Sequence, residues 1–506
     1  MKFKVSVPLK RLCHRASTDA VTPAPHNRAM NAKTVAIIGG GFSGTVAAIR
    51  LLTSSKDGGA SLPFGSRLVL IEPGRAGEGL AYRAGPDYWR LNVPAVRMSA
   101  FPEWPNDFVE WARARDPQVQ GGDFLPRAWY GDYLSERLEA ARKRSPRWLK
   151  FERIRTRATS IEVEDDSARI GLADGAAVQA DRVLLALGNS PSAGPLPGVQ
   201  AFTDPWDMSW MEDLPTYVPR VLLVGTGLTM IDVMLKISEE RPDARVLAIS
   251  RHGLVPMPHD HEHAMRRRFD AKTLLARGPL SKRLRIFREQ VAASGEDWRS
   301  VLQRVREEFP VLWRAAPRRV RRSFLRHLRA LWDVHRHRVP EATFQRIHAL
   351  RERKRLEVAA GRLLSTKCIK GGTVVAWRPR GSDKIREDLV DAVLNVTGPD
   401  SNPNRSACTL VQSLIEQGLC QPDELGLGWN TDLNGRLLDS KGDPSEVLYY
   451  AGPLLRAKHW EATAVPELRV HVQQTAAALA SSLTTPAGSY VRKLAAPLFR
   501  RARLAF

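Results

Sequence analysis

The chain has 506 residues, enough for two or three domains, and 43% of them are hydrophobic, which suffices for globular cores. No stretch approaches about 18 consecutive apolar residues, so the sequence predicts no membrane-spanning helix. The formal net charge of +23 comes from two segments: residues 1–33 carry seven Lys/Arg and one Asp, and residues 265–355 carry 26 Lys/Arg and nine Asp/Glu. The remaining chain is neutral, so the charge does not by itself indicate a nucleic-acid-binding protein.

The cysteines and the N-terminal stretch are informative about the cellular compartment of the protein. Four cysteines are scattered along the chain: Cys13, Cys368, Cys408 and Cys420. They form no C-x-x-C pair, which indicates neither a disulfide framework nor a zinc ribbon, and we expect a cytoplasmic protein. Residues 1–32 are basic and lack the apolar core of a secretory signal, so we expect a disordered leader, with Met30 as an alternative start.

Residues 35–52 contain the first motif: a buried strand, a glycine turn and a helix. The turn reads Gly39-Gly40-Gly41-Phe42-Ser43-Gly44, with the spacing G-x-G-x-x-G. In a dinucleotide-binding turn, Gly39 permits the tight bend, Gly41 lets a pyrophosphate approach, and Gly44 lets helix and strand pack closely. The helix N-terminus then presents free N–H groups to the phosphates.

A second strand is predicted over residues 67–71, and it ends at Glu72, which can accept hydrogen bonds from ribose hydroxyls. Glu72 lies 33 residues after Gly39, farther than the usual separation of about 20. We attribute the excess to a surface loop over residues 53–66. A glycine turn without a ligand is the alternative interpretation.

Three further residues of this first unit are candidate cofactor contacts. Asn92 precedes a Val-Pro turn, and its side chain either meets a polar ring edge or satisfies its own turn. Arg127 begins a predicted helix that runs to Arg144, and we expect it to reach phosphate. A buried strand over residues 182–187 ends at Gly188, where it closes the first nucleotide-binding half.

A second strand–turn–helix unit begins at residue 220. Its turn contains Gly225 and Gly227, and Met230 stands where the first unit has its third glycine, so the helix can lie farther from the strand. Arg251 follows the next strand, at a place where NAD-binding folds often carry an acid. An arginine there can neutralise a 2′-phosphate, which favours NADPH over NADH.

The segment between this unit and the last strands is basic. Residues 258–263 read Pro-His-Asp-His-Glu-His; a metal site is possible only if His259, His261 and His263 share a face, and we favour a loop without metal. Apolar residues then recur at helical spacing, including Trp298, Val301, Leu302, Val305 and Phe309, then Phe324, Leu328, Leu331 and Trp332. We expect a solvated helical insert over the second nucleotide domain. A surface for an anion, RNA or acidic partner is the alternative, although no nucleic-acid recognition module is visible.

The predicted fold is α/β, with two Rossmann-like dinucleotide-binding domains, the second inserted in the first, and a basic helical insertion. A strand over residues 391–398 is expected to mark the return to the first domain. The predicted parts are a leader (1–32), a first domain in two pieces (33–215 and 391–480), a second domain (216–390) containing the insert (265–355), and a tail (481–506).

These motifs resemble the two-dinucleotide-fold flavoproteins, and more closely the bacterial FAD/NAD(P)-binding family that includes FAD-dependent urate hydroxylase and aspartate-type amino-acid N-monooxygenases. The matching stretches are Gly39–Gly44, Gly77–Tyr82, Leu91–Ala100, Phe124–Leu134, Gly225–Asp232, Val396–Pro399, and Gly452 with Trp460–Arg469. The basic insert and both termini match no motif.

The resemblance implies FAD at the first glycine turn and Glu72, with Gly452, Thr463 and Ala464 near the flavin, and NAD(P)H at the second turn. It implies a monooxygenase that uses O₂ to hydroxylate a small polar or anionic substrate at nitrogen or carbon. An NAD(P)H oxidase or a flavin reductase that passes electrons to a partner is the alternative, and a nucleic-acid-binding protein a remote one. A disulfide reductase would need a redox dithiol. No catalytic acid or base can be assigned.

Overall fold

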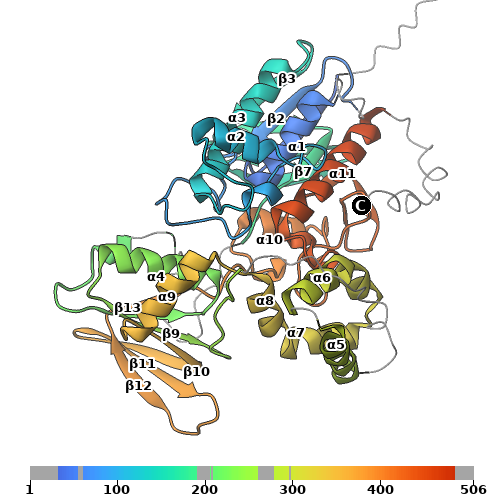
Figure 1. The fold of residues 1–506 in the computed structure, drawn as a ribbon. Coiled ribbons are helices and arrows are strands. Elements are labelled where there is room, and N and C mark those ends of the chain that lie inside the picture. Colours follow the sequence, from blue (N-terminus) through green and yellow to red (C-terminus); the bar gives the residue numbers. More distant parts are fainter. Residues whose placement is uncertain are drawn as a thin grey trace, which may run out of the picture.

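The computed structural model describes residues 32–54, 61–190, 206, 209–259, 279–295 and 298–484. Nearly all of the predicted leader and the tail beyond residue 484 lie outside these residues. Two six-stranded sheets, each flanked by helices, form two domains, and a cluster of helices lies beside them (Figure 1). The predicted α/β fold with two Rossmann-like sheets is confirmed.

The first sheet has the strand order β14-β15-β7-β1-β2-β3, and only the edge strand β14 is antiparallel to its neighbour. Its strands are β1 (Thr34–Ile38), β2 (Arg67–Ile71), β3 (Lys150–Ile154), β7 (Arg182–Leu185), β14 (Arg436–Leu438) and β15 (Pro444–Tyr450). Most of the central strand residues are buried apolar side chains, as expected for a parallel sheet covered on both faces. The chain leaves this sheet after β7 and returns at β14, so the second domain is inserted in the first.

Helices and a small sheet complete the first domain. The helices are α1 (Phe42–Thr53), α2 (Asp107–Arg115), α3 (Arg127–Arg144), α10 (Thr409–Glu416) and α11 (Val465–Thr484), with the short 3₁₀ helices η1 (Ala95–Arg97), η4 (Pro403–Arg405) and η5 (Pro453–Ala457). Helix α1 contacts both α3 and α11. The small antiparallel sheet consists of β4 (Ala158–Glu164), β5 (Ser167–Leu172) and β6 (Ala177–Ala180).

The second sheet has the order β12-β11-β10-β9-β8-β13. Its elements are β8 (Arg220–Val224), α4 (Leu228–Glu240), β9 (Arg245–Ser250), α9 (Glu341–Glu352), β10 (Leu356–Ile369), β11 (Gly372–Pro379), β12 (Arg386–Val390) and β13 (Ala392–Asn395), preceded by η2 (Ser209–Met211). Strand β13 pairs in parallel with β8. The prediction that residues 391–398 already belong to the first domain is therefore wrong for this strand, because its partner lies in the second sheet.

The helical insert packs against the first domain, and not over the second domain as predicted. It comprises α5 (Leu280–Ser294), α6 (Trp298–Ala315), α7 (Arg318–His327) and α8 (Arg329–Arg336). Its apolar faces share a core with Leu427, Ala457 and Trp460 of the returning first-domain chain. The following helix, α9, packs on the second domain through Phe344 and Ile347. Helical periodicity identifies an apolar face but not its partner, which is why the expected position over the second domain is wrong.

Candidate functional site

The first glycine turn lies where β1 ends, between the ends of β2 and β7. Gly39 has a φ of +101°, and its N–H donates to the carbonyl of Ile71 (2.9 Å). A Cβ on Gly39 would overlap the carbonyl oxygen of Ala186, just beyond β7, and a Cβ on Gly44 would overlap the carbonyl oxygen of Gly39. Both glycines are therefore required by the protein's own backbone, as predicted. Successive strands run to opposite sides of β1, so this is the switch point at which such sheets bind ligands.

Gly41 differs from its two neighbours in the motif. A Cβ there would meet only the Cα of Gly79, at 3.5 Å, an ordinary van der Waals contact, and its φ of −70° suits any residue. The fold thus leaves open space beside Gly41, and a pyrophosphate approaching the backbone explains a glycine at this position. Phe42 and Ser43 begin α1 and are buried, and the first N–H groups of the helix have no partner one turn back. The turn therefore fits the phosphates of a dinucleotide.

Glu72 lies directly against this turn. One carboxylate oxygen accepts a hydrogen bond from the N–H of Gly40 (2.6 Å), and the other accepts from the N–H of Gly74 (2.9 Å). The long loop between α1 and β2 does not displace it, because β2 is in parallel register with β1 along its whole length. The carboxylate is thus held at the carboxyl edge of the sheet, where the predicted ribose contact requires it.

The other predicted flavin-side residues surround the same edge. Gly188 follows β7 with a φ of +71° and no protein atom within 4 Å of an added Cβ. Gly452 follows β15, and a Cβ there would meet the hydroxyl of Tyr450 at 2.7 Å. Thr463 is exposed and, with Ala464, immediately precedes α11. Their contacts with a flavin stay predictions.

The second glycine turn follows β8 and has the same geometry, with β13 as the neighbouring strand. Gly225 has a φ of +124°, and a Cβ there would meet the carbonyl oxygen of Val396 at 2.5 Å. An added Cβ on Gly227 would meet no atom within 4 Å, so the space beside it is again open. Met230 is completely buried where the first turn has Gly44. The turn fits a second dinucleotide.

Arg251 follows β9 and is exposed at the carboxyl edge of the second sheet. The structure adds Arg380, which the sequence analysis missed: its guanidinium donates to Nδ1 of His252 (3.1 Å). Partial burial, Arg380 and Arg251 lower the pKa of His252, so the three side chains share one positive region. Arg380 follows β11, in an antiparallel extension that the glycine motifs do not reveal, and no local signal in the sequence connects it with Arg251.

Arg127 joins the two domains. Its guanidinium forms an ion pair with the buried carboxylate of Asp232 on α4 (2.9 Å), and its Nε donates to the carbonyl of Arg90. Trp89 Nε1 donates to the backbone oxygen of Asp232 (3.1 Å). Burial raises the pKa of Asp232 although Arg127 opposes the shift. This partner was not foreseen, and the phosphate contact of Arg127 stays a prediction.

Asn92 and His259 meet at a cavity beside α11. The carbonyl oxygen of Asn92 lies 3.0 Å from Nε2 of His259, and burial, followed by the charge of Arg338, lowers the pKa of this imidazole to about 4. Asn92 lines the cavity together with Pro466, in the first turn of α11. His261 and His263 lie outside the described residues. Within the described part of the chain, no group of three His, Cys, Asp or Glu side chains is arranged to hold a metal ion.

The cysteines with described positions form no disulfide. Cys368 and Cys408 are exposed, whereas burial raises the pKa of the Cys420 thiol to about 12. Cys13 lies outside the described residues. In the described residues, no helix combines the length and the hydropathy needed to cross a membrane.

Residues 36–190 match the model of a FAD-NAD(P)-binding family. This region therefore resembles an FAD-NAD(P)-binding domain. No curated protein sequence matches the chain. The fold is similar to solved structures of the reduced ornithine hydroxylase from Pseudomonas aeruginosa (TM-score 0.58, 14% identity, covering 90% of this chain and 100% of that one) and of the L-lysine 6-monooxygenase from Pseudomonas syringae (0.58, 16%, 90% and 99%).

A third similar structure is the ornithine N-hydroxylase from Kutzneria sp. 744, described with reduced FAD, NADP⁺ and L-ornithine (TM-score 0.57, 17% identity, covering 90% of this chain and 99% of that one). At these identities the likeness extends to the fold. The family match adds FAD and NAD(P) binding as the property of the family that residues 36–190 resemble.

Proposed function

We propose that this protein is an FAD-dependent monooxygenase that consumes NADPH and hydroxylates an anionic substrate. The observation that carries the proposal is the pair of glycine turns at the switch points of two sheets. In each turn the first glycine is demanded by backbone geometry, whereas the second faces open space that a pyrophosphate would fill. One chain thus offers two dinucleotide sites, which suits hydride transfer from NADPH to a flavin.

The chain's own residues position both cofactors. The N-terminus of α1 and the backbone at Gly41 hold the pyrophosphate of FAD, and Glu72 accepts hydrogen bonds from its ribose. The N-terminus of α4 and Gly227 do the same for NADPH, and Arg251 with Arg380 neutralises its 2′-phosphate. Bound FAD supplies the hydride acceptance and the reaction with O₂.

Hydroxylation is proposed from three observations. The solved structures with the same architecture include ornithine and lysine hydroxylases. The cavity beside the start of α11 is lined by Arg97, Arg306, Arg336 and Arg338. Guanidinium groups recognise carboxylate and phosphate, so this cavity favours an anionic substrate. The disulfide reductases that share the architecture need a redox dithiol, and the described cysteines do not provide one.

The test begins with the visible absorption of the purified full-length protein, which should show an oxidised flavin that NADPH bleaches without air. L-Ornithine, L-lysine, L-aspartate and urate are then screened for NADPH oxidation, with hydrogen peroxide measured in parallel. With a true substrate, one atom from labelled O₂ should enter the product for each NADPH consumed.

Two outcomes oppose the proposal. A colourless protein that binds no added FAD would exclude a flavoenzyme. If peroxide accounts for all NADPH with every candidate substrate, and a partner protein is reduced instead, the chain is an electron-transfer reductase.

A further inference from the structure

A cavity lies inside the helical insert, between α5, α6, α7 and α8. It has a volume of about 590 Å³, within the range of roughly 300–1,000 Å³ typical of ligand pockets. Its wall is predominantly apolar and includes six large aromatic side chains: Phe287, Trp298, Phe309, Trp313, Phe324 and Trp332. Such a wall suits an apolar molecule.

The charges at this cavity have one sign. Arg283, Arg288 and Arg321 line it, and none of its described lining residues is acidic. Arg321 lies with its guanidinium carbon 5.8 Å from the ring centroid of Trp313, a cation–π arrangement. An apolar cavity with a purely basic edge therefore favours a ligand that carries negative charge.

A smaller cavity of about 30 Å³ adjoins it, and we call it the throat. Leu302 and His335 line both cavities, so the two are neighbours. Asn92 and Pro466 also line the throat, and Pro466 lies in the first turn of α11, at the end that was predicted to face the flavin. The throat is thus lined both by residues of the insert and by a residue at the start of α11.

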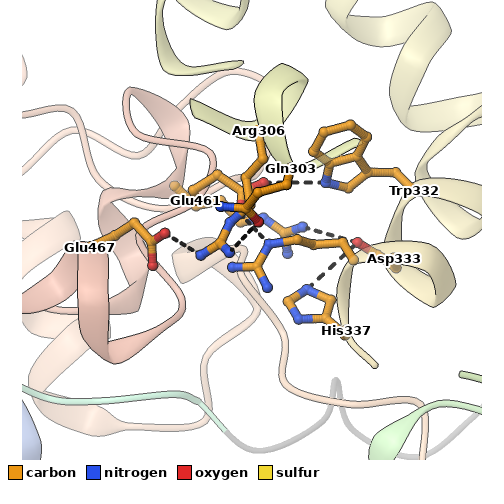
Figure 2. A network of polar contacts seen from close by, with 9 residues as sticks. Gln303, Arg306, Trp332, Asp333, His337, Glu461 and Glu467 are labelled. Carbon is orange, nitrogen blue, oxygen red and sulfur yellow. Dashed lines mark hydrogen bonds and ion pairs between the residues drawn. The ribbon is translucent and has the colours of Figure 1, made fainter. Parts of the chain in front are cut away.

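The guanidinium groups of four residues line the throat: Arg97, Arg306, Arg336 and Arg338. None of its described lining residues is acidic. Two carboxylates lie behind them. Glu461 accepts hydrogen bonds from the Nε atoms of Arg306 (3.3 Å) and Arg336 (2.6 Å), and Glu467 pairs with Arg306 (Figure 2). Burial and the charge of Arg336 lower the pKa of Arg306 to about 10, as expected where positive groups are crowded.

We propose that the cavity and the throat together bind an amphiphilic organic anion, whose apolar body lies among the helices of the insert and whose anionic head contacts the throat arginines beside α11. The claim that this ligand is the substrate rests on the proposed monooxygenase function. The claim that the cavity and the throat bind such a ligand does not depend on that function. It replaces the small polar substrate expected from the sequence by one with a large apolar part.

Charge also argues against the chain's own C-terminal segment as the occupant. Residues 485–506 contain five Arg/Lys and no acid, so they would bring further positive charge to a basic edge. A ligand with an anionic head instead gains charge-assisted hydrogen bonds from the guanidinium groups.

The experiment is calorimetric titration of the full-length protein with dodecanoate below its micelle concentration. Dodecanoate should bind, whereas dodecyltrimethylammonium, which has the same tail and the opposite charge, should not. Arg97→Gln in the throat should weaken dodecanoate binding about tenfold, which equals about 1.4 kcal/mol. The control Arg319→Gln makes the same charge change at an exposed position on α7 that lines neither cavity, and it should bind like the wild type.

A second pair of variants tests the apolar part. Ala316 lines the large cavity, so Ala316→Trp should fill part of it and abolish binding, whereas Ala315→Trp, at an exposed neighbour outside the lining, should not. Equal binding of both dodecyl compounds, or equal losses in Arg97→Gln and Arg319→Gln, would overturn the proposal. The absence of any binding would do so too.

These measurements need neither NADPH nor O₂, so they separate the two proposals. Dodecanoate binding by a protein that takes up no flavin would sink the monooxygenase but keep the ligand class. A flavin-loaded enzyme that hydroxylates a small amino acid and ignores dodecanoate would do the reverse.

Discussion

The two glycine turns of this chain have the same backbone plan and different surroundings. In both, a glycine with positive φ ends the first strand, because a carbonyl from the neighbouring strand leaves no room for a side chain. The turns diverge after that. An added Cβ on Gly44 would overlap the carbonyl oxygen of Gly39, whereas the equivalent position in α4 holds the side chain of the buried Met230. The first turn therefore requires a glycine where the second does not.

The residues beside the two turns differ in charge. Glu72 lies against the first turn and suits ribose hydroxyls, whereas Arg251 and Arg380 border the second sheet's carboxyl edge and suit a 2′-phosphate. The proposed function assigns the first site, beside an acid, to FAD and the second, basic site to NADPH. Four predictions test this difference.

The largest effect is expected for Gly44→Ala. The added Cβ would overlap the carbonyl oxygen of Gly39, a backbone atom at the end of β1 whose residue is hydrogen-bonded to Ile71 of β2. We expect a loss of about 5 kcal/mol in the free energy of unfolding, at the upper end for single substitutions, and little soluble protein. At the equivalent position, Met230→Leu conserves volume and should cost less than about 1.5 kcal/mol. Thermal unfolding of both variants measures this contrast in stability. A stable Gly44→Ala protein would show that α1 can shift away from the carbonyl oxygen of Gly39.

The second prediction concerns the position two residues after Gly44 in α1 and two residues after Met230 in α4. This position holds the buried Val46 in α1 and the buried Asp232 in α4. Arg127→Met removes the ion-pair partner of Asp232 and leaves a buried carboxylate unpaired. Such a loss costs about 3–5 kcal/mol. The double variant Arg127→Met/Asp232→Leu should regain most of it, because neither charge is then buried.

The pH dependence of that variant has a definite sign. Burial raises the pKa of Asp232 in the folded protein, so the folded state favours the protonated acid and loses stability as the pH rises through this pKa. Without Arg127, which opposes the shift, the loss should be larger. Chemical denaturation across pH should therefore show Arg127→Met closest to wild type in acid. A deficit that does not change with pH would mean that Asp232 is not its source.

The third prediction compares the cofactors that the two glycine turns bind. A Cβ at Gly41 or at Gly227 meets no close protein atom, so alanine at either position should leave folding intact. Gly41→Ala should lose FAD and keep the fold, whereas Gly227→Ala should keep FAD and lose affinity for NADPH. Flavin content after purification and the rate of anaerobic reduction measure the two effects, and each variant serves as the control for the other. If both variants lose only flavin, the second turn is not a nucleotide site.

The sequence predicted the parts of the site that depend on local geometry. Both glycine turns, Glu72 at the end of β2 and the position of Arg251 follow from strand–turn–helix patterns that nearby residues determine. The contacts that could not be predicted join residues far apart in the chain. Arg127 meets Asp232 across 105 positions, and Arg380 meets His252 across 128.

The insert illustrates the same limit. The spacing of Trp298, Val305 and Phe309 correctly indicated an amphipathic helix, but the core that covers its apolar face includes Trp460, more than 150 positions away. The position of β13 in the second sheet was missed for a related reason, since an apolar strand does not reveal which neighbour it pairs with. Local patterns specify elements and turns, whereas the pairing of elements depends on tertiary packing.

The smallest expected effect is at the basic edge of the second site. Arg251 and Arg380 are exposed, so solvent and salt screen their attraction for a 2′-phosphate. We expect Arg251→Ala and Arg380→Ala each to raise the KM for NADPH roughly three- to tenfold, less than the full value of a hydrogen bond to a charged group. The KM for NADH, which lacks this phosphate, should hardly change. Added salt should narrow the gap between wild type and variants, because it weakens the charge interaction that they lack.

Arg245→Ala provides the matched control. Arg245 is an exposed arginine at the start of β9, whereas Arg251 follows the end of the same strand. Ligands bind at the carboxyl ends of such strands, so removing Arg245 should leave both KM values unchanged. Equal losses for NADPH in Arg245→Ala and Arg251→Ala would show that overall positive charge attracts the cofactor. The second turn would then have no specific 2′-phosphate site, and the contrast in charge between the two turns would not determine which nucleotide each one binds.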